Sequence, residues 1–235
     1  MSVAPPDSGP AMGLYVTDPA RAVVEFGLLL AALPLQRALP AGDGHPVLVL
    51  PGLLAADDST WPLRRILRGL GYRVHGWRLG RNIGPTEACV TGMQKRIDDL
   101  SDRYGEAISL IGWSLGGIYA RDLARRTPDS VRQVITLGSP FRLQHNGESR
   151  ATKVFNRYSH LHVEHRTLPL ESETTPLPVP STSIYSRTDG VVNWKACLRS
   201  DVNGIEVRGS HVGLALNPEV YRILAHLLPA PWRQT

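Results

Sequence analysis

Short apolar runs alternate with longer segments of helical spacing from residue 44 onward. This alternation constrains the fold most, because strands separated by helices join into a parallel sheet. The predicted strands are 47–50, 72–77, 107–113, 131–137, 183–185 and 205–207, and the predicted helices are 61–70, 87–104, 115–126 and 218–228. The strands are apolar at nearly every position, which is typical of strands covered on both faces. The sequence therefore predicts an α/β fold: a mostly parallel sheet with helices on both faces.

The composition is that of a folded protein, and the alternation without internal repeats indicates one domain. Of the 235 residues, 42% are hydrophobic and 20% are charged, which argues against a disordered chain. We expect residues 44–235 to form this domain and residues 1–43 to precede it as a segment with one helix. Within 141–182 the sequence predicts no strand, only a short helix near 152–161 and a Pro-rich run from 169 to 180. Because long irregular insertions in compact domains are often functional, we expect 141–182 to form a small cap.

The N-terminal segment contains the most apolar stretch of the chain, from Ala22 to Leu35. Asp18 and Pro19 predict the start of its helix, with Asp18 as the N-cap and Pro19 as the first helical residue. The stretch is 14 residues long and contains Glu25, so it is too short to span a bilayer. We expect the helix to pack on the domain. Docking on a membrane surface is the alternative, but the stretch lacks the basic polar face that favours such docking.

Charge and cysteine content exclude several classes of partner and cofactor. Lys and Arg number 26 and Asp and Glu 21, for a net charge of +5, but the basic residues are dispersed, so we expect no nucleic-acid partner. Two cysteines cannot form a disulfide framework. The sequence has no phosphate loop or dinucleotide fingerprint, and we expect no cofactor. The first positive charge is Arg21, so no basic region of a signal peptide is evident and we expect a cytoplasmic protein.

The first chemical signal is the segment Gly112-Trp113-Ser114-Leu115-Gly116. It lies where a predicted strand ends and a predicted helix begins, so its serine has to turn the chain sharply in a strained backbone conformation. Side chains two residues before and after the serine would collide, which explains the glycines. The turn lifts Ser114 Oγ out of the sheet at the positive end of the helix, as a nucleophile requires. The alternative is a Gly-rich turn in which Ser114 only caps the helix.

A serine nucleophile needs a base, and the base needs an orienting carboxylate. Chemistry in such sheets gathers at the carboxyl ends of the strands. His211 follows the last predicted strand and is the candidate base, whereas His45 precedes the first strand and His75 lies within one. Asp189 follows the fifth predicted strand and is the candidate acid, while its rival Asp201 precedes a strand. The structural alternatives are a turn-forming aspartate and a buried, hydrogen-bonded histidine.

Two backbone N–H groups have to stabilise the oxyanion of such a reaction. One is predicted at Leu115, at the N-terminus of the helix after the serine. The other is predicted at Leu53, because Gly52 lets the loop after the first strand turn this N–H toward the serine; alternatively, this loop is only a turn. Leu54 and Trp113 flank the predicted site and are expected to line an apolar substrate pocket.

Other patterns are weaker. His160, His162 and His165 are residue types that bind metals, but their spacing fits neither one helix face nor a familiar zinc motif. We therefore expect no metal site there. Cys89 and Cys197 lie in segments expected to be helical, away from the predicted site, and are predicted to be free buried thiols.

These motifs, in the chain order Ser114, Asp189, His211, resemble the α/β-hydrolase fold, and within it bacterial lipases and esterases. The resemblance covers residues 44–230. It rests on Val-Leu-Val-Leu-Pro-Gly-Leu at 47–53, Ile-Gly-Trp-Ser-Leu-Gly-Gly at 111–117, Ile-Thr-Leu-Gly-Ser-Pro-Phe at 135–141, Arg-Thr-Asp-Gly-Val-Val at 187–192 and Gly-Ser-His at 209–211. Three features depart from the pattern: the first two antiparallel strands of the full fold are not evident, Pro51 stands where many lipases carry His, and the cap is short.

The resemblance implies a serine esterase or lipase that hydrolyses carboxylic esters with apolar acyl groups, through a Ser-His-Asp triad and an acyl-enzyme. Its substrate would be a small-molecule or lipid ester, and no cofactor is implied. A thioesterase or amidase on the same triad remains open, as does a non-catalytic binding protein that has kept the fold.

Overall fold

The computed structural model describes residues 9–141, 149–163 and 176–229. Six strands form one sheet in the order β2-β1-β3-β4-β5-β6, and every neighbouring pair is parallel. The strands are β1 (Pro46–Leu50), β2 (Arg73–Gly76), β3 (Ile108–Trp113), β4 (Val131–Leu137), β5 (Ser181–Tyr185) and β6 (Asn203–Glu206). The predicted α/β class is confirmed, and no strand end differs from its predicted position by more than two residues.

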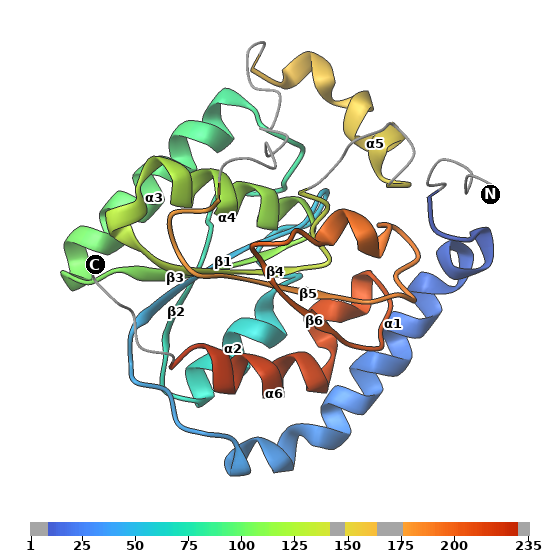
Figure 1. Ribbon diagram of the computed structural model, residues 1–235, viewed down its shortest axis with the longest axis horizontal. Coiled ribbons are helices and arrows are strands. Elements are labelled where there is room, and N and C mark those ends of the chain that lie inside the picture. Colours follow the sequence, from blue (N-terminus) through green and yellow to red (C-terminus); the bar gives the residue numbers. More distant parts are fainter. Residues whose placement is uncertain (1–8, 142–148, 164–175, 230–235) are drawn as a thin grey trace.

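Helices cover both faces of this sheet (Figure 1). The helices α2 (Trp61–Gly69) and α6 (Pro218–Leu227) lie on one face, and α3 (Glu87–Tyr104) and α4 (Leu115–Arg126) lie on the other. All five residues of β1 and all six of β3 are buried, because each strand lies between the two helical layers. This is the burial that the continuous apolar runs predicted.

Short 3₁₀ helices complete the described elements. They are η1 (Leu33–Ala38), η2 (Pro128–Ser130), η3 (Ser159–Leu161), η4 (Trp194–Cys197) and η5 (Val212–Leu216). In the predicted cap the structure has η3 and the one-and-a-half-turn helix α5 (Thr152–Arg157), which together fall within the predicted helix at 152–161. Residues 142–148 and 164–175, which include the start of the Pro-rich run, lie outside the described residues. The cap therefore stays a prediction.

The structure corrects the predicted start of the N-terminal helix. The helix α1 (Met12–Ala32) begins before Asp18, so Pro19 lies in the helix interior and not at its first position. The Asp18 carboxylate does not cap α1. It is buried and accepts hydrogen bonds from backbone N–H groups of Gly190 and His211. The Asp-Pro pair has the local chemistry of a helix start, but the partners of this aspartate are distant in the sequence.

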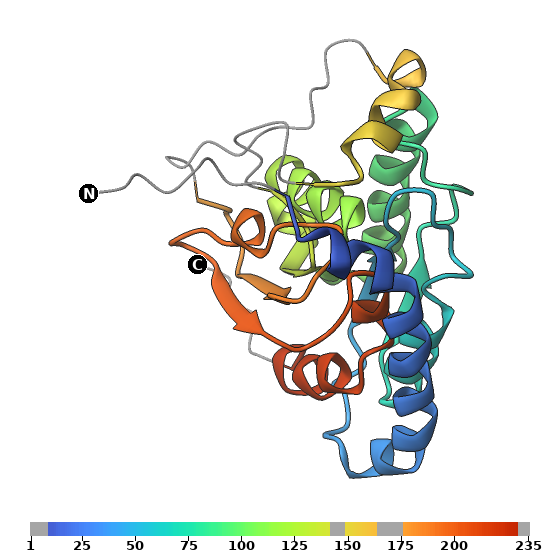
Figure 2. The same ribbon diagram turned by 90° about the vertical axis from the view of Figure 1, so that its right-hand side faces the viewer.

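The outward face of α1 and η1 is apolar. The helix α1 lies along the outside of the domain, beside η5 and α6 (Figure 2). Ten large apolar side chains are exposed: Met12, Tyr15, Val16, Val23, Val24, Phe26, Leu28, Leu30, Leu33 and Leu35. Among the described helices, none is both long and apolar enough to cross a membrane.

The strand order creates a switch point between β1 and β3. From β1 the chain crosses to β2 on one side, whereas β3 and the later strands add on the other side. The loops after β1 and β3 therefore leave the sheet in opposite directions at its carboxyl edge, which is where ligands bind in open α/β sheets. Ser114 follows β3 directly, and the loop with Gly52 and Leu53 follows β1.

Candidate active site

Ser114 forms the junction between β3 and α4, in a backbone conformation that residues other than glycine rarely adopt. Its φ is 54° and its ψ is −121°, outside the usual regions for a residue with a Cβ. A Cβ built on Gly112 would lie 2.4 Å from the carbonyl oxygen of Gly116, and one on Gly116 would lie 2.3 Å from that of Leu50. Both glycines are needed for this sharp turn, as the sequence predicted.

An unbroken chain of hydrogen bonds joins the three candidate catalytic residues. Ser114 Oγ lies 2.9 Å from His211 Nε2, and His211 Nδ1 lies 2.7 Å from Asp189 Oδ2. Ser114 is 8% exposed, His211 5% and Asp189 3%, so these hydrogen bonds are largely shielded from solvent. The structure thus brings together three residues that the sequence separates by up to 97 positions.

The turn after β5 holds Asp189 in place. Its Oδ1 accepts hydrogen bonds from the N–H groups of Val191 (2.8 Å) and Val192 (2.7 Å), which leaves Oδ2 for the imidazole. The rival Asp201 instead forms an ion pair with Arg199, with 2.8 Å between Nη2 and Oδ2. It lies before β6, at the end of that strand opposite the histidine, as the polarity of a parallel sheet requires.

The charges around His211 favour its protonated form. Burial by itself lowers the pKa of His211, because it penalises the charged imidazolium. The Asp189 carboxylate opposes this effect through its charge and its hydrogen bond, and the Asp18 carboxylate adds to it. The net result is a pKa above the ordinary value, so this imidazole is a stronger base than a free histidine.

The two candidate oxyanion donors belong to the helix that follows the serine and to the loop after β1. Leu115 is the first residue of α4, so its N–H lies in the unpaired first turn of the helix. Gly52 packs directly on the serine, since a Cβ built on it would lie 3.2 Å from Ser114 Cβ. Within the described part of the chain, the N–H groups of Leu53 and Leu115 have no hydrogen-bond acceptor. Their role as oxyanion donors stays a prediction.

Asn82 braces the loop after β1, and sequence reasoning missed it. The side chain is 1% exposed, and its Nδ2 donates to the carbonyl of Pro51 at 2.8 Å. The backbone carbonyl oxygen of Asn82 accepts the N–H of Leu54 at 2.6 Å. These bonds hold Leu54 at a φ of 62°. An asparagine in a loop gives no sequence signal for such a role, because its partners lie about thirty residues away.

The two predicted pocket residues have different surroundings. Leu54 is 39% exposed, so its side chain is open to a ligand. Trp113 is buried, and its indole Nε1 donates to the carbonyl oxygen of His211 at 3.1 Å. The indole also lies beside the imidazole, with 6.2 Å between ring centroids. Trp113 therefore contacts both the backbone and the ring of the histidine.

A second Ser-His-Asp chain lies at the opposite edge of the sheet. His45 Nδ1 contacts Asp43 Oδ1, and His45 Nε2 lies 2.7 Å from Ser109 Oγ. Ser109 is completely buried within β3, and Gln133 Nε2 also contacts its Oγ at 3.2 Å. Burial lowers the pKa of His45, against the effect of Asp43. This set satisfies buried polar groups and leaves no room for a substrate at the serine.

Neither the weaker histidine pattern nor the cysteines add to the site. His162 Nε2 lies 2.9 Å from the carbonyl oxygen of Ile83, His160 is exposed, and His165 lies outside the described residues. Among the residues that the structure describes, no three metal-ligand side chains cluster. Cys89 and Cys197 are free and buried, as predicted. Burial raises the pKa of the Cys197 thiol, and the Asp189 carboxylate adds to this effect.

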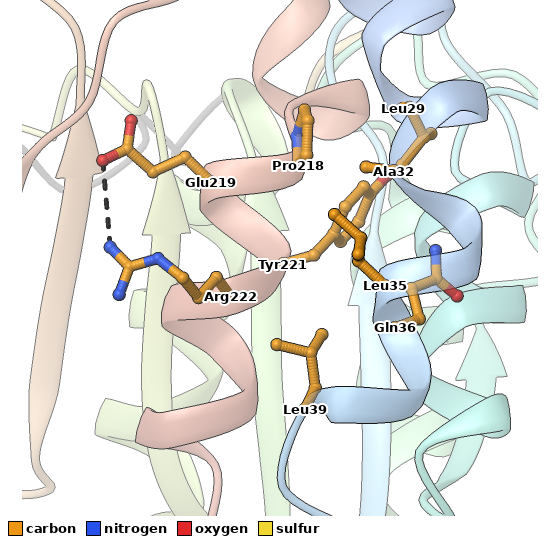
Figure 3. Close-up of a pocket in the computed structure, with 9 residues that line it drawn as sticks. All are labelled: Leu29, Ala32, Leu35, Gln36, Leu39, Pro218, Glu219, Tyr221 and Arg222. Carbon is orange, nitrogen blue, oxygen red and sulfur yellow. Dashed lines mark ion pairs between the residues drawn. The ribbon is translucent and has the colours of Figure 1, made fainter.

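A separate apolar pocket lies between α1, η1 and α6 (Figure 3). Its walls include Leu29, Leu35, Leu39 and Tyr221, and the ion pair between Glu219 and Arg222 lies at its rim. None of the candidate catalytic residues lines it.

Comparisons with known proteins define the fold. No family model and no curated protein matches the sequence. Among solved structures, the Bacillus licheniformis lipase BlEst2 matches with a TM-score of 0.61 and 13% identity, over 80% of this chain and 94% of the lipase. Aspergillus fumigatus lipase B matches with a TM-score of 0.62 and 16% identity, over 86% of this chain and 59% of the lipase. The Paleococcus ferrophilus monoacylglycerol lipase matches with a TM-score of 0.52 and 17% identity, over 82% of this chain and 96% of the lipase. The chain has the α/β-hydrolase fold.

Proposed function

We propose that this protein is a serine hydrolase that cleaves carboxylic esters with apolar acyl groups. The observation that carries the proposal is the hydrogen-bond chain from Asp189 through His211 to Ser114, at a strained turn between strand and helix. A nucleophile, a base and an orienting acid in this contact form the arrangement that activates a serine hydroxyl.

In the proposed mechanism, Ser114 Oγ attacks the ester carbonyl carbon while His211 Nε2 takes its proton. Asp189 holds the imidazole and stabilises the imidazolium that forms. The N–H groups of Leu53 and Leu115 donate to the oxyanion of the tetrahedral intermediate. The C–O bond to the alcohol then breaks, and the imidazolium returns the proton to the leaving alcohol. Water, activated by the same histidine, hydrolyses the acyl-enzyme and restores the serine. No cofactor is needed.

Two observations support an apolar ester. Exposed apolar side chains flank the site in the chain: Leu54 after the candidate oxyanion loop, and Val212, 38% exposed, directly after His211. The solved structures of similar fold include proteins named as lipases, one of them a monoacylglycerol lipase. Fold similarity alone does not define a substrate, so the proposal depends on the site.

A panel of substrates with one acyl group and different leaving groups tests the proposal. We expect kcat/KM for p-nitrophenyl butyrate or octanoate to exceed that for the matched thioester and the matched anilide, and Ser114→Ala to lose all three activities. A thioester or anilide that is hydrolysed faster than the ester would contradict the ester assignment. Failure of the folded wild-type protein to hydrolyse any of them would indicate a binding protein.

A further inference from the structure

Asp18 is a buried carboxylate on a helix whose apolar side chains face solvent. It lies in the second turn of α1 and is 1% exposed, whereas Val16 and Val23 on the same helix are 68% and 70% exposed. A carboxylate loses favourable hydration when it is buried, so a buried one has to be compensated by hydrogen bonds and charge. The partners of Asp18 therefore explain why it turns inward.

Those partners are the backbones of the two loops that carry His211 and Asp189. Asp18 Oδ2 accepts the N–H of His211 at 2.8 Å and the N–H of Gly190, the residue after Asp189, at 3.0 Å. Asp18 Oδ1 accepts the N–H of Val212 at 3.0 Å. One carboxylate thus fixes the main chain of the base and the main chain beside the acid relative to each other.

Glycines in both loops make room for α1. A Cβ built on Gly190 would lie 2.3 Å from the carbonyl oxygen of Leu14, and one on Gly213 would lie 1.3 Å from Glu25 Oε2. Glu25 in turn accepts the N–H and the hydroxyl of Ser210, at 2.6 and 2.5 Å. Two carboxylates of α1 therefore bind the loop of the histidine, and this contact requires small residues opposite the helix.

Arg21 completes the contact. Its guanidinium lies 3.3 Å from Asp18 Oδ2 and donates to the carbonyl oxygen of Thr188 at 2.8 Å, just before Asp189. The charged groups that face His211 and its neighbours are therefore Asp189 from the turn after β5, and Asp18, Arg21 and Glu25 from α1.

We infer that Asp18 is a positioning residue of the active site, which acts through the backbone of His211 and Gly190. By fixing both loops, it keeps His211 Nδ1 on Asp189 and Nε2 on Ser114. Its negative charge also stabilises the imidazolium that forms when the serine is deprotonated. The inference rests on the proposed hydrolase function, and it makes α1 a part of the catalytic apparatus.

The test compares Asp18→Asn with Asp43→Asn. Asp43 is the matched control, because it also accepts a backbone N–H and contacts a histidine ring, but at the opposite edge of the sheet.

Asparagine at position 18 cannot accept all three N–H bonds and carries no charge. We expect kcat for the ester to fall about 10–100-fold with little change in KM, since a small displacement of a catalytic group has effects of this size. The acidic limb of kcat/KM moves to lower pH, because the imidazolium loses a stabilising charge. Asp43→Asn keeps the wild-type kcat and acidic limb, even if its Tm falls.

Arg21→Gln provides a second variant should Asp18→Asn fail to fold. It leaves the Asp18 carboxylate in place but removes a nearby cation, so the acidic limb is expected to move to higher pH. A folded Asp18→Asn protein with wild-type kcat and acidic limb overturns the inference. If Asp18→Asn does not fold, an unchanged acidic limb in Arg21→Gln overturns it. Wild-type hydrolysis, lost in Ser114→Ala, keeps this outcome separate from a failure of the proposed function itself.

Discussion

Ser114 and Ser109 show that residue types alone do not identify a candidate nucleophile. They lie five positions apart, and each is hydrogen-bonded to a histidine that contacts an aspartate. Ser109 is near the start of β3, fully buried and also bonded to Gln133. Ser114 directly follows the end of the strand, at a φ of 54° and at the N-terminus of α4. The backbone conformation and the edge of the sheet, and not the triad of residue types, distinguish the candidate nucleophile.

At this scale, Asp189→Asn tests the acid. The substitution is expected to leave a folded protein whose imidazole prefers the wrong tautomer, with kcat for an ester reduced by up to about 10⁴-fold, as for such a change in a serine protease. Asp201→Asn is the control, because Asp201 bonds to Arg199 and not to the histidine, and it should stay within severalfold of the wild type. Greater loss in Asp201→Asn than in Asp189→Asn, at equal Tm, would refute the assignment of the acid.

The raised pKa of His211 predicts the pH dependence. Only the neutral imidazole can take the serine proton, so activity falls as the pH drops through the pKa of this histidine. Because Asp189 and Asp18 raise that pKa, the acidic limb of kcat/KM should lie above the ordinary histidine value of about 6.5. In Asp189→Asn the residual activity should show an acidic limb at lower pH. An acidic limb below the ordinary value in the wild type would contradict these electrostatics.

At the scale of elements, the sequence predicted those that carry a strong local pattern. The helix predicted at 115–126 is α4 (Leu115–Arg126), because its glycine turn and helical spacing define both of its ends. The start of α1 was predicted wrongly, because there the local signal was misleading. Asp18 next to Pro19 has the local chemistry of an N-cap, but its carboxylate binds N–H groups 172–194 residues away. Local signals cannot identify a contact that forms only when the chain is folded.

Gly190→Ala and Gly27→Ala test this contact between α1 and the site. At position 190 the new Cβ would lie 2.3 Å from the Leu14 carbonyl oxygen, so α1 has to shift. We expect a loss of about 1–3 kcal/mol in the free energy of unfolding, as for overpacked sites, together with a lower kcat. Gly27 is exposed on α1 with no atom within 4 Å of a Cβ. Its replacement should add about 0.5–1 kcal/mol of stability and leave kcat unchanged. Equal Tm and kcat in Gly190→Ala and the wild type would contradict the contact.

At the scale of the whole molecule, the candidate site gathers at one edge of the sheet. The loops after β1, β3, β5 and β6 supply Leu53, Ser114, Asp189 and His211, all at carboxyl ends of parallel strands. Strand polarity predicted that these four positions lie at this edge, and the glycine motif around Ser114 and the resemblance to α/β-hydrolases singled them out. The contribution of α1 could not be predicted, because a helix outside the strand and helix alternation has no fixed place relative to the sheet.

The central claim is that Ser114 is the nucleophile, and covalent labelling with a fluorophosphonate probe tests it most directly. Wild type, Ser114→Ala and Ser109→Ala are compared at equal concentration, after their Tm values show that all three are folded. The account predicts one probe per chain in the wild type and in Ser109→Ala, at similar rates, and no labelling of Ser114→Ala. Labelling of Ser114→Ala at the wild-type rate, or a folded wild-type protein that does not react, would contradict it.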